Sequence, residues 1–76
     1  MATKGIHTVY DSQRNRWINK QEKSSQPLSS HLTKDNAVAK GRRIAKKKKA
    51  EHIIHYQDGP IQRRNSYGND PFPPRG

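Results

Sequence analysis

The chain has 76 residues, a net charge of +10 at pH 7 and no cysteine. A chain of this length forms one domain at most, and the lack of cysteine excludes disulfide bridges and thiolate metal sites. Only 11 residues are Ile, Leu, Val or Phe, so disorder competes with folding. One tryptophan and three tyrosines, with turn signals between the apolar runs, favour a small folded core.

Nothing in the sequence resembles a targeting or membrane-spanning segment. Residues 1–10 lack the apolar stretch of a signal peptide. No apolar run approaches the ~20 residues that cross a bilayer. We therefore expect a cytoplasmic protein without membrane contact.

The first third of the chain predicts strands. Residues 5–10 are rich in β-branched and aromatic residues, residues 11–15 are turn-like, and residues 16–20 read as the returning strand of a hairpin. A third, irregular strand is expected around residues 26–30. Pro27 allows it only at a sheet edge or a strand end.

One amphipathic helix is predicted over residues 33–50, which contain eight basic residues and one acid. Thr33 is a good N-cap, and Asp35 suits the positive end of the helix dipole. At 100° per residue, small and apolar side chains share one face, namely Ala37, Val38, Gly41, Ile44 and Ala45. Basic side chains cover the opposite face, namely Lys40, Arg42, Arg43, Lys46, Lys47 and Lys49.

Two more strands follow the helix. Residues 51–56 form the clearest strand of the chain, Asp58-Gly59 is a strong hairpin signal, and residues 60–64 read as the partner strand. The sequence thus predicts an α+β fold with the order β-β-(β)-α-β-β, in which the helix packs on one face of an antiparallel sheet. We expect one domain over residues 1–65 and an extended Pro/Gly-rich tail over 66–76, with Tyr67 and Phe72 as its anchors.

The expected core takes residues from every predicted element except the third strand. Its members are Ile6, Val9, Trp17, Val38, Ile44, Ala45, Ile53, Ile54 and Ile61. The adjacent pairs Trp17-Ile18 and Ile53-Ile54 are ambiguous, because a strand buried on one side alternates. One member of each pair is therefore expected to be exposed, covered by the tail or placed at a dimer interface.

The C-terminal third carries a family resemblance. Residues 55–61 read HYQDGPI and residues 63–74 read RRNSYGNDPFPP. This pattern resembles the bacterial domain of unknown function 2188, which implies a small α+β domain and no established activity. Two departures are Lys23 and Lys49, which stand where that family typically has glycine, the residue that enters left-handed conformations most freely.

The charge predicts a polyanion partner. Lysine and arginine contacts with phosphates supply most of the affinity of non-specific nucleic-acid binding. The predicted binding residues are Lys40, Arg42, Arg43, Lys46, Lys47, Lys49, Arg63 and Arg64. We expect non-specific binding of DNA or RNA, with an exposed Trp17 or Tyr56 stacking on bases. The competing interpretation is a solvated face that keeps the protein soluble.

The alternative function is a dimeric or partner-binding module. A homodimer that shares apolar surface would relieve the shortage of core residues. An edge strand is able to pair with another chain, and the Pro-Phe-Pro-Pro tail has the composition of a groove ligand. We favour the tail as a strap that closes the core. In this alternative the helix charge mainly serves solubility.

The sequence predicts no enzyme, cofactor or small-molecule substrate. His52 and His55 lie three apart on a predicted strand, so they point to opposite faces and cannot chelate together. His7 and His55 are able to face each other across neighbouring strands, but two imidazoles alone make a weak metal site. The acidic residues are spread singly, and no catalytic spacing of Ser, His and Asp is apparent.

Overall fold

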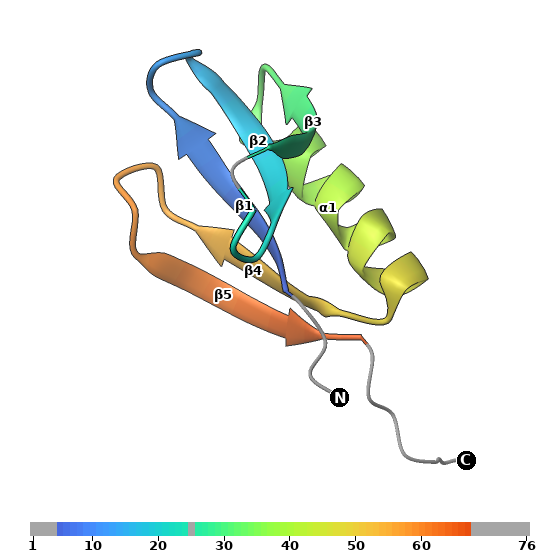
Figure 1. Cartoon of the computed structure of the whole chain (residues 1–76). Helices are drawn as coiled ribbons and strands as arrows, with labels where there is room; N and C mark the ends of the chain where they lie inside the picture. Colours follow the sequence, from blue (N-terminus) through green and yellow to red (C-terminus); the bar gives the residue numbers. More distant parts are fainter. Residues whose placement is uncertain (1–4, 25, 68–76) are drawn as a thin grey trace, which may run out of the picture.

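The computed structural model describes residues 5–24 and 26–67 as one sheet with a helix across one of its faces (Figure 1). The elements are β1 (Ile6–Asp11), β2 (Arg16–Gln21), β3 (Pro27–His31), α1 (Lys34–Lys48), β4 (Glu51–His55) and β5 (Ile61–Ser66). This arrangement confirms the predicted α+β class and the order of the elements, including the irregular third strand. No helix in these ranges is long and apolar enough to cross a bilayer.

The sheet is mixed rather than purely antiparallel, which corrects the expected pairing. Its strand order is β3-β2-β1-β4-β5, and only the central pair β1–β4 is parallel. Two hairpin turns bring β3 back to the direction of β1, and the crossover through α1 then starts β4 in that same direction. A helical crossover joins parallel strands in this way, whereas a tight turn joins antiparallel ones.

The helix begins as the sequence predicts. The Thr33 hydroxyl oxygen accepts a hydrogen bond from the Asn36 backbone N–H at 3.2 Å. At the other end, Lys49 has a φ of 53°, and the Ala50 N–H donates to the Ala45 carbonyl at 2.8 Å. The chain therefore leaves α1 through a left-handed residue, as helices that end at a glycine commonly do.

The core is thin and lies mostly between α1 and the central strands. Ile6, Ala45 and Ala50 form a buried cluster, and Ile44 and Tyr67 pack against it. The Tyr67 N–H also donates to the Ala50 carbonyl at 3.3 Å. Residues 68–76, which hold Phe72 and most of the predicted tail, lie outside the described residues.

Three core predictions need correction. Ile61 is 48% exposed, because it lies on the edge strand β5 opposite His55, on the face of the sheet that α1 does not cover. Both members of the pairs Trp17-Ile18 and Ile53-Ile54 are buried, although the helix covers only one face. On the other face Ile53 lies beneath the chain at Gly5, close to Glu22 and His7.

Buried polar side chains form the contact between the central strands of the sheet and the middle of the helix. Thr8, Asn19 and His52 are fully buried side chains from the three central strands. They lie directly under Gly41 of α1. A Cβ atom at Gly41 would come within 2.5 Å of Asn19 Oδ1, 2.6 Å of His52 Nε2 and 2.8 Å of Thr8 Oγ1.

The donor and the acceptor of each hydrogen bond in this polar cluster follow from the side chains involved. The Thr8 hydroxyl donates to Asn19 Oδ1 at 2.5 Å, so it accepts from His52 Nε2–H at 2.7 Å. Asn19 Nδ2 donates to the Ala37 carbonyl of α1 at 2.9 Å and to Ser29 Oγ of β3 at 3.0 Å. Asn19 therefore ties the helix backbone to the sheet through a buried side chain.

Replacing Gly41 with alanine tests this close approach. Alanine favours a helix by about 1 kcal/mol over glycine, so an exposed site would gain stability. Here the new methyl group has no room, and we expect Gly41→Ala to lower the free energy of unfolding by about 1–3 kcal/mol. Urea denaturation measures the change, and an increase in stability would contradict the packing described above.

The two lysines with a positive φ give a second prediction. Lys23 and Lys49 have φ values of 66° and 53°, a conformation that costs a non-glycine residue about 1–2 kcal/mol. Lys23→Gly and Lys49→Gly should each raise the free energy of unfolding by about 1 kcal/mol. The matched control is Lys48→Gly inside the helix, which should lower it by about 1 kcal/mol in the same urea experiment.

Candidate functional site

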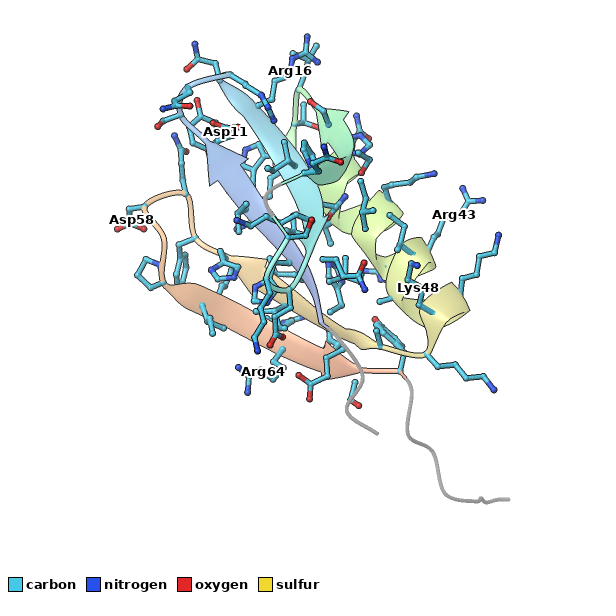
Figure 2. The ribbon with its side chains drawn as sticks, in the orientation of Figure 1. Asp11, Arg16, Arg43, Lys48, Asp58 and Arg64 are labelled. Carbon is cyan, nitrogen blue, oxygen red and sulfur yellow. The ribbon has the colours of Figure 1, made fainter. Side chains whose placement is uncertain are left out.

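Six of the seven basic side chains of α1 are exposed, and Lys34 is half-buried. The exposed ones belong to Lys40, Arg42, Arg43, Lys46, Lys47 and Lys48, and none of them pairs with a carboxylate within residues 5–24 and 26–67. Figure 2 shows Arg43 and Lys48 along α1 and Arg64 beside β5. The face predicted to bind polyanions is therefore available to a partner.

The predicted binding residues lie in several different surroundings. Arg42 and Arg63 line a groove between α1 and β5. Lys40 and Lys47 line a separate hollow on the β3 side, together with Leu28. Arg43 is exposed on α1, and Lys49 ends the helix. The Lys46 ammonium lies 5.6 Å from the centre of the Tyr67 ring. Arg64 Nε lies 3.9 Å from a carboxylate oxygen of Glu51.

The groove between α1 and β5 exists because the helix packs on β1 to β4 and leaves β5 uncovered. Its volume is about 600 Å³. Its lining residues are Lys34, Asp35, Val38, Ala39 and Arg42 from α1, and Ile54, Gln62 and Arg63 from the sheet. The groove thus combines an apolar part, formed by Val38, Ala39 and Ile54, with three cations and one carboxylate.

Lys34 links the helix to β5 beside two aromatic rings. Its ammonium group donates to Gln62 Oε1 at 2.5 Å. The same ammonium lies 5.1 Å from the centre of the Trp17 ring and 5.7 Å from that of Tyr56. These contacts engage Lys34 within the protein, so Arg42 and Arg63 are the cations of the groove that remain for a ligand.

A second cluster lies on the sheet face that α1 does not cover. His55 Nδ1 donates to the Gly59 carbonyl at 2.8 Å, so His55 Nε2 accepts from His7 Nδ1–H, also at 2.8 Å. His7 Nε2 then faces Glu22, whose carboxylate oxygen lies 3.7 Å away. The predicted contact between His7 and His55 is confirmed, as is the placement of His52 on the opposite face.

This histidine pair is a hydrogen-bonded structural element in the described part of the chain. Burial and the neighbouring His55 lower the pKa of His7, while Glu22 opposes that shift. The hollow beside the pair has a volume of about 380 Å³ and also contains Lys20 and Lys23. Within residues 5–24 and 26–67, no group of three or more His, Asp or Glu side chains is placed to hold a metal ion.

The comparison with protein families identifies the chain. A family described as an uncharacterized protein conserved in bacteria, DUF2188, matches residues 6–67. The chain belongs to this family. No curated protein and no solved structure matches it. The match confirms the resemblance seen in the sequence, and the family carries no established activity.

Sequence reasoning missed most of the groove. The sequence predicts Val38 and Ile54 as core residues, which is confirmed for the buried Ile54, and it indicates no role for Ala39 and Gln62. Trp17 is 8% exposed, as its place in the predicted core requires, so Tyr56 is the exposed member of the two aromatic residues considered for base stacking. A signal was available in the polar run Gln62 to Ser66, since a strand with so few apolar positions is typical of an uncovered sheet edge.

The buried His52 predicts a pH dependence of stability. Burial, and then the charges of Arg42 and His7, lower its pKa from 6.5 to about 4. The folded protein holds this imidazole neutral. The contribution of His52 to the free energy of unfolding is therefore fully present above pH 6.5, and it is lost as the pH falls toward 4. The loss amounts to about 3 kcal/mol in the free energy of unfolding.

Urea denaturation between pH 7.5 and pH 4 measures that loss. His52→Gln should flatten the profile, because it removes the group that takes up the proton. His7→Gln is the matched control, since the pKa of His7 is also lowered, and it should leave most of the slope. Parallel profiles for the wild type and His52→Gln would contradict the assignment.

Proposed function

We propose that this protein binds nucleic acid without sequence specificity, through the exposed basic residues of α1 and β5, and that it catalyses no reaction. The observation that carries the proposal is the set of cations on α1 that lack a carboxylate partner in the described residues. A net charge of +10 adds a long-range attraction for polyanions. The proposed location is the cytoplasm, where nucleic acid is accessible.

Helix stability alone does not account for this charge. Basic residues favour the C-terminal end of a helix, and Lys46, Lys47 and Lys48 occupy that end. The effect fades within the last turn, so it gives Lys40, Arg42 and Arg43 no advantage in the middle of α1. Solubility would be served by charges anywhere on the surface. Contacts with phosphates explain why the cations gather on this helix.

The test is a titration of fluorescent duplex DNA and single-stranded RNA at two salt concentrations. We expect micromolar binding that weakens steeply with salt, with a slope of about 0.9 per phosphate contact on duplex DNA. Changing Arg42, Arg43, Lys46 and Lys47 to Glu should abolish binding without unfolding the protein. The matched control changes Arg14, Arg16, Lys20 and Lys23 to Glu, and it should retain much more affinity. Equal losses in both variants would show that the helix has no special role.

A second candidate is a dimer or partner-binding module whose helix charge serves solubility. It is favoured by Leu28 in the edge strand β3 and Leu32 just after it, which are 44% and 73% exposed. Light scattering at high protein concentration bears on the homodimer, and a strict monomer would count against it.

A further inference from the structure

We propose that the groove between α1 and β5 binds a single strand of nucleic acid, with a sugar or base on its apolar part and a phosphate at Arg42 and Arg63. This inference rests on the proposed function, because it assigns the place and the type of nucleic acid bound. The rest of the basic helix surface then serves to attract the strand rather than to seat it.

The shape of the groove fits a flexible strand. Its volume of about 600 Å³ lies within the range of pockets that enclose small molecules, roughly 300–1,000 Å³. Val38, Ala39 and Ile54 give it an apolar surface, which a sugar or an unstacked base covers well. A duplex keeps its bases stacked inside and presents its phosphates on a convex surface. Only a single strand places both groups in the groove at once.

The charge of the groove fits a phosphate. Arg42 comes from α1 and Arg63 from β5. Guanidinium groups bind phosphate through paired hydrogen bonds, a geometry that lysine does not offer. Asp35 is the only acid among the lining residues and lies in the first turn of α1, two helical turns before Arg42. A phosphate is therefore best accommodated away from Asp35, toward Arg42.

An aromatic ring lies next to the groove. Tyr56 is 48% exposed and stands beside the Lys34 ammonium, which is itself part of the groove lining. Bases stack on exposed aromatic rings regardless of their identity, which suits binding without sequence specificity. Trp17 is too buried for this role, so Tyr56 is the stacking residue of the proposed site.

An acidic protein segment is a weaker fit to the same groove. Its carboxylates would pair with Arg42 and Arg63, but an acidic segment carries no group that regularly stacks on the exposed ring of Tyr56. A single strand uses the cations, the apolar part and the ring together. The combination, rather than the charge alone, decides the choice of ligand.

The experiment compares a groove variant with a charge-matched control on the same helix. Ala39→Glu places a carboxylate in the groove at an exposed position, and glutamate is a good helix former. Asn36→Glu adds the same charge at an exposed position that does not line the groove. Circular dichroism verifies that both variants, and Tyr56→Ala, remain folded.

Fluorescence anisotropy then measures the affinity of the full chain for labelled dT12, rU12 and a 12-base-pair DNA duplex at low salt. We expect the wild type to prefer the single strands. Ala39→Glu and Tyr56→Ala should each weaken single-strand binding about tenfold or more, while Asn36→Glu changes it little. Duplex binding should respond similarly to both glutamate variants. The dT12 and rU12 arms show whether the strand is DNA or RNA.

Three outcomes would overturn the inference. Equal losses of single-strand affinity in Ala39→Glu and Asn36→Glu would mean that charge alone governs binding, in which case the proposed function survives and the groove does not. Displacement of dT12 by an octaglutamate peptide at lower concentration than by unlabelled dT12 would assign the groove to an acidic protein segment. No binding of any of the three nucleic acids by the wild type would remove the proposed function as well.

Discussion

The close approach of α1 to the sheet at Gly41 determines how the rest of the molecule is arranged. The helix backbone rests there on the side chains of Thr8, Asn19 and His52, and no Cβ atom separates them. The Asn19 amide then bonds to the Ala37 carbonyl, which fixes the helix in position along the sheet. A small domain with few large apolar residues gains stability mainly by such close contact, because each atom then has neighbours on all sides.

The same contact explains the groove. With α1 held over the central strands, its flank with Arg42 faces β5 without touching it. The Lys34 ammonium spans the gap at one end through Gln62. The groove is therefore a consequence of helix placement, and Arg42 of α1 and Arg63 of β5 both line it.

The three histidines of the central strands show how the environment gives chemically identical side chains different hydrogen bonds and different roles. His52 is enclosed beneath the helix, and this burial, followed by the charges of Arg42 and His7, lowers its pKa to about 4. Its Nδ1 atom has no hydrogen-bond partner in the described residues, which makes protonation at that atom costly. His7 and His55 share one hydrogen bond on the other face, where Glu22 partly offsets the effect of burial on His7. Their roles follow from the face of the sheet each occupies.

The sequence by itself determined the α+β class, the order of the elements, the Thr33 cap, the basic character of α1 and the facing of the histidines. These depend on local pattern, capping and the two-residue period of strands, which are properties of short segments. Tertiary structure alone decided the parallel pairing of β1 with β4, the burial of both members of each isoleucine-containing pair and the exposure of Ile61. It also decided that Arg42 and Arg63 share a groove while Arg64 lies apart. These features depend on which strands become neighbours and where the helix rests, and residues far apart in the chain set both.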